Sequence, residues 1–561
     1  MSRIDDSLDR LLSDYASSSL TRREAMKRAA ALGVSASALA GLLATRRSSV
    51  AAATLQDAPV AGGTLREGYD LDFSRMDPVG TNWYDPAFSA LYENVITNDP
   101  DGAKVPQIAE RWEFSADGTV LTFTIRTGLS FHSGDVLDAA AVAAAFTEIK
   151  TSGSLAVFFA PVETIEATDE TTVVLTMAHP YYDVINVVDT GYWSIFNNRV
   201  RSELESAEAG TYGQQQIDGS GPFTFGEWVP GSHVTVNKWA EYPGSIVPYF
   251  ENTGPAYLDG IRWEFISEAA QRAIRIENGE IDTLRGPAAQ DISRLEGNGD
   301  LNVVRLKEWS GYIFGVNHTK TEYDFQDVRM RQALSGAINR QAIADALLFG
   351  EGEPLYGPIT SADRYYTAEV EQFNQFDLDA AKALVAEVGW TAGDDGILEK
   401  NGQRLEITLP VQDESFNRQL GTVLQDQLRQ LGVAVEVQIL DRASFFNTLA
   451  NENPDSYLFY YLWPVPIDVV SLFVGSATIP DPNWAQASIP EVDAAIEAWQ
   501  NAANEEELAA AGAQFQLAVA EHLPTIPLIN RNAFWVSRSN VQGYLPHQWN
   551  LYPFYNDVWL S

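Results

Sequence analysis

The stretch that decides the fold is Trp309–Gly350, with the sequence WSGYIFGVNHTKTEYDFQDVRMRQALSGAINRQAIADALLFG. Its first part, from Gly311 to Asn317, is apolar, too short for a helix and bounded by turn residues, which together predict a buried strand. Two helices are expected to follow that strand directly. A strand with paired helices is by itself a packing unit and does not identify a function.

The two helices are predicted from the spacing of apolar residues after a polar turn. Between residues 328 and 338 apolar side chains recur at helical intervals. This pattern leaves three residues for the solvent side, Arg329, Arg331 and Gln332. Asn339 is then the expected N-cap of a second helix, which Gly350 ends.

Length and composition limit the classes of protein that the chain can belong to. With 561 residues the chain is too long for one ordinary core, so two or three domains are expected. The net charge of −39 argues against a nucleic-acid partner or an anionic membrane surface, because both need basic patches. The chain has no cysteine, which leaves no disulfide, no thiolate metal site and no lipid-carrying cysteine.

The N-terminal residues 1–53 have the layout of an export signal. Arg22, Arg23 and Lys27 precede an Ala/Leu/Gly-rich run, and Ala51–Ala53 supplies small residues for cleavage. The paired arginines resemble the twin-arginine pattern, with Ala25 where that pattern prefers a large apolar residue. The alternative is a membrane anchor, but the apolar run is shorter than the about 20 residues that a spanning helix needs. Residues 54–61 are expected to form a mobile leader.

A second informative stretch lies between Ala109 and Asp135. Apolar and polar residues alternate on both sides of Asp117-Gly118, which predicts a hairpin. The segment TGLSFHSGD with His132 follows and leads into an alanine-rich helix. A single histidine without a second ligand nearby is expected to be structural. Gly219–Phe223 predicts a further hairpin turn, since neither phosphate-binding glycine pattern is present.

These motifs, in this order, resemble the family-5 extracellular solute-binding proteins of the dipeptide- and oligopeptide-binding type. The central stretch matches through Tyr312, Phe314 and Asn317, through MRQAL with Met330 in place of Val, and through AINR. The hairpin and the FHSG segment match the family's A-E-x-W, D-G and F-H-x-G pattern. The resemblance covers nearly all of residues 62–561 and implies an α/β, two-lobe periplasmic-binding-protein fold with a hinge, in the large three-domain variant.

The resemblance also implies a division of the chain. Lobe 1 is expected to combine residues 62–90, 215–308 and 534–561, with 91–214 as its extra subdomain and 309–533 as lobe 2. Residues 405–410, 418–431 and 433–440 have a strand–helix–strand pattern, which predicts a parallel pair with a crossover helix. Residues 492–522 are expected to be helical. The strand 525–530 is expected to lie beside the first crossing, which makes Tyr312, Phe314 and Ile529 the hinge residues.

Residues 456–468, SYLFYYLWPVPID, are the predicted ligand-binding segment. The aromatic side chains are expected at a strand's end, where α/β folds place ligands. The predicted ligand contacts in this segment are Tyr460, Tyr461, Trp463 and Asp468. Further contacts are expected from Tyr69, Asp413 and Arg418. Ordinary core packing explains each aromatic residue, taken singly, about as well.

Two departures from the resemblance bear on the ligand. Peptide-binding relatives carry an Asp that meets the ligand's ammonium group near the position of Pro466, whereas the nearest acid here is Asp468. The loop 410–413 has Asp413 where dipeptide-type relatives carry an arginine for the ligand's carboxylate. An unpaired buried charge costs several kcal/mol, so free dipeptides are disfavoured. Oligopeptides rank first and oligosaccharides second.

The function implied is capture of an organic solute and its delivery to an ABC importer, without chemistry on the ligand. The expected partners are the permease with its ATPase and, during export, the twin-arginine translocase, and the chain is expected to be a monomer. It would act in the periplasm or on the outer face of the cytoplasmic membrane. No metal, cofactor or catalytic residue is expected. The alternatives from other classes are a secreted hydrolase, for which the chain has neither H-E-x-x-H nor G-x-S-x-G, and a structural envelope protein.

Overall fold

The computed structural model describes residues 58–561 apart from 82, 84, 310 and 462–465. Residues 61–560 form one compact unit, hereafter the body. Three predictions, the export-signal residues Arg22, Arg23 and Lys27, lie outside the described residues, and so does Trp463.

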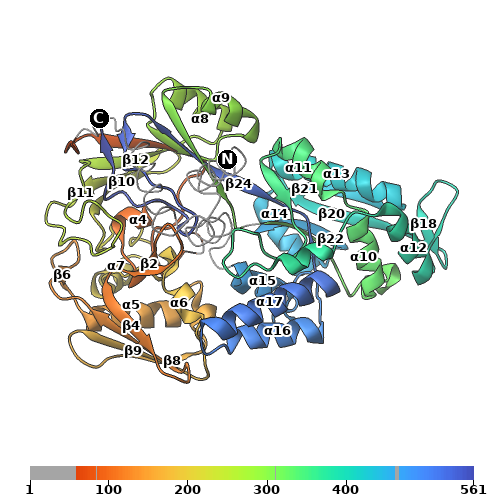
Figure 1. Ribbon diagram of the computed structural model, residues 1–561, viewed down its shortest axis with the longest axis horizontal. Coiled ribbons are helices and arrows are strands. Elements are labelled where there is room, and N and C mark those ends of the chain that lie inside the picture. Colours follow the sequence, from red (N-terminus) through yellow and green to blue (C-terminus); the bar gives the residue numbers. More distant parts are fainter. Residues whose placement is uncertain (1–57, 82, 84, 310, 462–465) are drawn as a thin grey trace, which may run out of the picture. The chain divides into compact units, whose positions relative to one another are not determined.

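The largest sheet of the body has eight strands and gathers segments from both ends of the chain (Figure 1). Its order is β10-β11-β12-β1-β13-β24-β14, and β16 pairs with β24 off this path. The strands are β1 (Thr64–Tyr69), β10 (Phe223–Val229), β11 (His233–Lys238), β12 (Gly260–Phe265), β13 (Thr283–Arg285), β14 (Leu301–Lys307), β16 (Gly352–Pro354) and β24 (Ile529–Arg538). β1 is parallel to β12 and β13, whereas the remaining pairs are antiparallel. Helices α8 (Ala269–Glu277) and α9 (Ile292–Glu296) connect its later strands.

A second sheet of four strands contains the predicted hairpin. Its order is β4 (Ala109–Phe114), β5 (Val120–Ile125), β9 (Thr172–Met177) and β8 (Val162–Ala167). β4 and β5 are antiparallel around a turn in which Gly118 has φ +69°, so the predicted D-G hairpin is confirmed. Helices α5 (Ala139–Ser152), α6 (Val184–Val187) and α7 (Asn198–Ala207) belong to the same part of the chain.

His132 has a structural role, because both of its ring nitrogens contact the backbone. Its ring nitrogens lie 3.0 Å from the Gly221 carbonyl and 3.3 Å from the Gly219 amide, and burial lowers its pKa. The histidine therefore joins the FHSG segment to the turn at the start of β10.

The central stretch forms the predicted strand and helices. β15 (Gly311–Val316) is buried throughout, and α10 (Val328–Gly336) and α11 (Arg340–Leu348) follow it. The Asn339 side chain accepts a hydrogen bond from the Ala342 amide, which confirms the predicted N-cap. The helix ends at Leu348, two residues before Gly350, because Phe349 already adopts the left-handed conformation with φ +54°.

The prediction that Arg331 faces solvent is wrong. Its side chain is buried and donates to the carbonyls of Phe325, His522 and Leu523. The last two lie at the end of α17 (Glu505–His522), where backbone carbonyls have no partner within the helix and attract a positive charge. A cation can therefore be buried on the apolar side of α10.

The strand–helix–strand prediction for residues 405–440 is confirmed. β20 (Glu406–Gln412) and β21 (Ala434–Leu440) are parallel, and α13 (Ser415–Leu431) connects them. Together with α12 (Leu378–Val388), they contribute to one apolar core that also contains β15, α10 and α11.

The C-terminal helices contact a different core. Residues of α14 (Arg442–Asn447), α15 (Pro466–Val474), α16 (Pro490–Gln500) and α17 belong to the same apolar cluster as the four-stranded sheet. The Tyr182 amide donates to the Ala502 carbonyl at 2.8 Å, which joins the two groups of elements directly. The predicted helical segment 492–522 is thus two helices rather than one, because residues 501–504 interrupt it.

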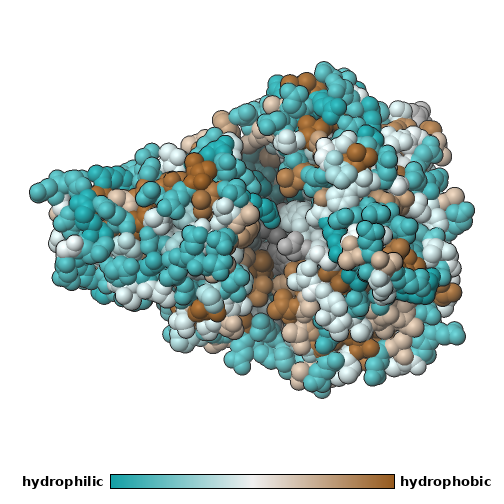
Figure 2. All heavy atoms as spheres, turned by 180° about the vertical axis from the view of Figure 1, so that it is seen from behind, coloured by the Kyte–Doolittle hydropathy of each residue, from teal (hydrophilic) through white to brown (hydrophobic). Residues whose placement is uncertain are grey.

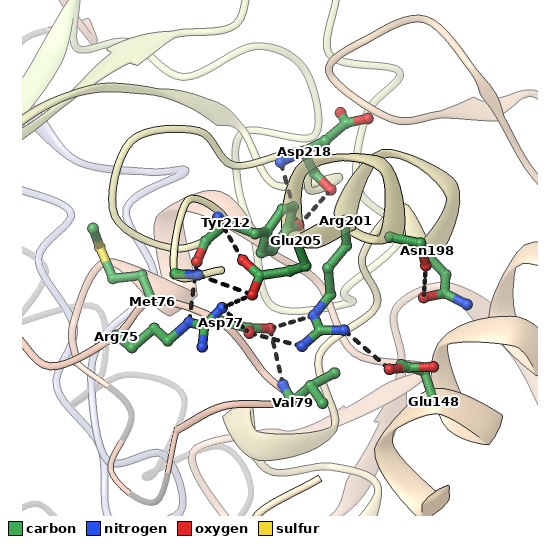
Figure 3. A network of polar contacts seen from close by, with 12 residues as sticks. Arg75, Met76, Asp77, Val79, Glu148, Asn198, Arg201, Glu205, Tyr212 and Asp218 are labelled. Atoms are coloured by element: carbon green, nitrogen blue, oxygen red, sulfur yellow. Dashed lines mark hydrogen bonds and ion pairs between the residues drawn. The ribbon is translucent and has the colours of Figure 1, made fainter. Parts of the chain in front are cut away.

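A buried network of ion pairs ties the loop after β1 to α7 and α5 (Figure 3). The Arg201 guanidinium donates to both oxygens of Asp77, at 2.9 and 3.1 Å, and to Glu148 at 3.0 Å. Arg75 contacts Asp77 at 3.3 Å and Glu205 at 2.6 Å. The Asp77 side chain is 0% exposed and that of Arg201 is 10% exposed, so the pair depends on its own hydrogen bonds.

Candidate solute-binding site

Two chain segments pass side by side from the large sheet to the core that contains β15. In the sheet, β14 pairs with β24 from Leu301–Arg538 to Lys307–Asn532. Beyond it, β15 pairs with β23 (Ile526–Pro527) and β22 (Ser456–Tyr461), and the Leu528 amide donates to the Tyr312 carbonyl at 2.9 Å. Tyr312 and Ile529 therefore lie in these crossings, and Phe314 pairs with Ile526.

Glu308 holds the two crossings together. Its carboxylate accepts from the Arg531 Nε at 3.2 Å and from the Tyr460 hydroxyl, and it lies 3.7 Å from Arg285. Its backbone carbonyl accepts from Asn530 and Thr360. The side chain is 9% exposed, so these donors replace the water that the carboxylate loses.

The predicted contact Tyr460 is part of this cluster. Its ring lies 4.7 Å from the ring of Tyr312 and 4.4 Å from the Arg531 guanidinium, and burial raises its pKa. Tyr461, its neighbour on β22, is buried and donates its hydroxyl to the Pro358 carbonyl. Both hydroxyl groups thus have partners within the protein.

Tyr69 is connected to the Glu308 cluster through Tyr552 and Arg285. It is buried at the end of β1, and its hydroxyl is 2.7 Å from that of Tyr552. The Arg285 guanidinium lies over the Tyr552 ring at 5.3 Å and approaches Glu308. The structure therefore links the predicted residues Tyr69 and Tyr460 through Arg285 and Glu308.

Asp468 lies in the first turn of α15 rather than in a loop. Its carboxylate accepts from the Trp499 indole at 3.0 Å, and the same indole donates to Asp183 at 3.2 Å. Burial raises the pKa of both carboxyl groups, and the proximity of Asp183 raises that of Asp468 further. The two acids can share a proton, because two like charges in one buried site cannot both ionise at low cost.

Asp413 and Arg418 pair with each other at the surface. Their side chains are 53% and 44% exposed, and their ion pair lies between the end of β20 and the first turns of α13. The structure thus does not bring these two residues together with the Glu308 cluster through any described contact. Their predicted role in ligand binding stays a prediction.

Three adjoining cavities lie inside the body, and Asn550 lines all of them. The first has about 430 Å³ of non-protein space, part of it open to solvent, between Lys104, Asp189, Arg364 and Trp549. The second is lined mainly by neutral polar and aromatic side chains such as Tyr92 and Gln107, together with Asp189, and the third by residues that include Arg285, Glu308 and Trp309. Figure 2 shows that one face of the body is hollowed, with hydrophobic residues along parts of the rim and a largely hydrophilic surface elsewhere.

Sequence reasoning missed the residues that line the first cavity. They come from three distant parts of the chain, around residues 98–104, 186–190 and 363–365, and from Trp549 and Asn550. No local motif marks them, because only the tertiary fold places them side by side.

The described residues give no sign of a resident metal or a membrane span. Within the described ranges, no three His, Asp or Glu side chains form a group that could hold a metal ion. In the same part of the chain, no helix is both long and apolar enough to cross a membrane.

Comparisons with known proteins all find bacterial solute-binding proteins. A family model described as bacterial extracellular solute-binding proteins, family 5 (middle), matches residues 104–479. The oligopeptide-binding protein AppA of Bacillus subtilis is 26% identical over 359 residues, which span 63% of each chain. The nickel-binding periplasmic protein of Escherichia coli is 25% identical over 429 residues, 72% of this chain and 76% of that protein.

Solved structures share the fold of the body. The structure of B. subtilis AppA in complex with a nonapeptide has a TM-score of 0.74 at 22% identity and covers 90% of this chain and 100% of its own. NikA of Brucella suis in complex with Fe(III)-EDTA has a TM-score of 0.75 at 21% identity, with 89% and 100% covered. The fold is thus that of two-lobe periplasmic binding proteins, as the sequence predicts.

Proposed function

This chain belongs to the family-5 bacterial extracellular solute-binding proteins, and from that premise we propose that it captures an organic solute and delivers it to an ABC importer. An oligopeptide is the first candidate, since the relatives include an oligopeptide-binding protein and a structure with a bound nonapeptide. The observation that carries the proposal is the set of cavities around Asn550, the third of which is lined by Glu308, Trp309 and Ala533 at the two crossings. Such concave sites between folded units are typical of ligand binding.

The proposed hinge is the pair of crossings at Tyr312 and Ile529, with Phe314 behind them. Lobe 1 would comprise 62–90, 215–308 and 534–561, the subdomain 91–214 and lobe 2 309–533. Two adjacent strands can bend without disturbing the cores on either side, which allows the lobes to close on a solute. The chain would do no chemistry on the ligand, and ATP would be consumed by the partner's ATPase.

The test of binding is ligand-dependent unfolding. Thermal unfolding of the mature chain should shift upward with a defined peptide pool and less or not at all with an oligosaccharide pool. A ligand at 100 times its Kd stabilises the native state by about 2.7 kcal/mol. Peptide and glycoside turnover is measured in the same samples. Hydrolysis of either pool would favour the secreted hydrolase, and no stabilisation by any pool would favour a structural role.

Export is proposed to use the twin-arginine translocase, after which the chain would act as a monomer in the periplasm or on the outer face of the cytoplasmic membrane. Arg22 and Arg23 are the only specific element of the signal, and Lys27 follows them. The double variant Arg22→Lys/Arg23→Lys should remain in the cytoplasm when cells are fractionated, whereas Lys27→Arg should still be exported. Normal export of the double variant would rule out this route.

A further inference from the structure

Arg364 stands in the first cavity between segments that are far apart in the chain. Its Nη2 donates to the Asn98 side-chain oxygen at 3.0 Å, and its guanidinium lies over the Trp549 ring at 4.7 Å. Asn98 follows α4 (Phe88–Leu91) in the proposed extra subdomain, whereas Arg364 belongs to the proposed lobe 2. The guanidinium is thus positioned by one hydrogen bond and one aromatic ring that come from two distant parts of the chain.

Arg364 forms no ion pair within 4.0 Å with a described carboxylate, although its charge acts at longer range on the neighbouring Asp363 and opposes the rise in the pKa of that carboxyl. In the described part of the chain, its guanidinium contacts the Asn98 side chain through one hydrogen bond and the Trp549 ring through a cation–π contact. This is unexpected in a chain with 76 acidic and 37 basic residues. The other cation of the cavity, Lys104, already forms an ion pair with Asp189, so it is neutralised locally.

The two acidic side chains of the cavity, Asp189 and Asp363, both accept hydrogen bonds from the protein. Asp189 accepts from Asn98 at 2.6 Å in addition to Lys104. Asp363 uses one carboxylate oxygen for the Tyr365 amide at 2.7 Å, and burial raises its pKa to about 6. Its second oxygen is available to accept a hydrogen bond from a solute that also reaches Arg364.

We propose that Arg364 binds a carboxylate, or a phosphate of similar geometry, on the solute, and that Asn98 and Trp549 position its guanidinium for this contact. The inference rests on the proposed solute-binding function and names the chemistry of one end of the ligand. A guanidinium offers parallel N–H donors that match a planar carboxylate, and stacking on an indole leaves its edge free. Because Asn98 and Arg364 come from different parts of the body, the anion site is complete only when these parts are in contact.

The experiment measures the affinity of several variants for probes with and without a free carboxylate. Calorimetry is carried out with a defined pool of tripeptides with free C-terminal carboxylates, the same tripeptides as C-terminal amides, and inorganic phosphate. The variants are Arg364→Ala, Arg364→Lys and Arg442→Ala. Arg442 is the control, since it also stacks on an aromatic ring, that of Phe446 at 5.5 Å, but is exposed on α14 and lines none of the three cavities.

The expected result is that free acids bind roughly 10- to 100-fold more tightly than amides, and that Arg364→Ala removes this difference. Arg364→Lys should restore part of it, because lysine keeps the charge but not the paired donors. Arg442→Ala should bind as the wild type does. Unfolding without probe confirms that each variant is folded.

Three results would overturn the inference, and they differ in what they imply for the proposed function. If acids and amides bind equally well, or if Arg364→Ala keeps the preference, solute binding stands and the role of Arg364 is wrong. If neither acids nor phosphate bind, the inference is also wrong. In that case, binding of the amides or of neutral oligosaccharides decides whether the proposed function survives.

Discussion

Arg201→Ala is expected to lower the free energy of unfolding by about 3–5 kcal/mol, the typical cost of breaking a buried ion pair by removing one partner. The Asp77 carboxylate is 0% exposed and would lose the two hydrogen bonds that Arg201 donates (Figure 3). Two contacts would remain: the Val79 amide, which donates to Asp77 at 3.1 Å, and the Arg75 guanidinium at 3.3 Å. The measurement is equilibrium unfolding in urea at neutral pH, provided that the transition is two-state.

The control for this prediction lies on the same helix. Arg199 is 56% exposed and pairs with Asp135 and Glu203, so Arg199→Ala should change stability far less than Arg201→Ala. The double variant Asp77→Ala/Arg201→Ala should lose less than the sum of the two single variants, since it removes the buried Asp77 carboxylate together with the cation that pairs with it. Equal effects of Arg199→Ala and Arg201→Ala would show that the network contributes no more than a surface ion pair.

Glu308→Gln is expected to lower the free energy of unfolding by about 1–3 kcal/mol, because hydrogen bonds to charged groups contribute that much. The substitution keeps the volume of the side chain but removes the charge that Arg531, Arg285 and the Tyr460 hydroxyl share. The Arg531 side chain is 39% exposed, so solvent screens part of the loss. Denaturant unfolding with the solute absent measures the effect.

Glu351→Gln is the matched control for Glu308→Gln. Glu351 also pairs with an arginine on these strands, Arg305, but the two side chains are 18% and 42% exposed, so this pair is more open to solvent than that of Glu308. Its replacement should cost less than that of Glu308. If both variants lower the free energy of unfolding equally, Glu308 does not hold the crossings together. The proposed hinge would then lack the stabilising contact assigned to it.

Local elements could be predicted from the sequence where one physical rule dominates. The D-G turn at Gly118, the buried strand at Gly311 and the N-cap at Asn339 each follow from a short pattern. The fold followed from the order of such motifs together with the family resemblance. Arg331 was misplaced because helical spacing cannot reveal that the carbonyls at the end of α17 lie within its reach.

The candidate site was harder to predict, for a physical reason. Tyr460 and Asp468 were selected because aromatic and acidic residues follow a strand, but their partners Glu308 and Asp183 lie about 150 and 280 residues away in sequence. The cavity residues Lys104, Arg364 and Trp549 carry no local signal, since tertiary packing alone brings them together. Whether Trp463 contacts the solute stays a prediction.

The central claim is that this chain binds one organic solute without altering it. Native mass spectrometry of the mature chain, incubated with a defined mixture of peptides and oligosaccharides, tests it most directly. The account predicts a complex with one intact solute per chain, a peptide with a free carboxylate first, which is released when the protein is unfolded. A chain that retains no solute from the mixture, or that converts the mixture to shorter products, would contradict it.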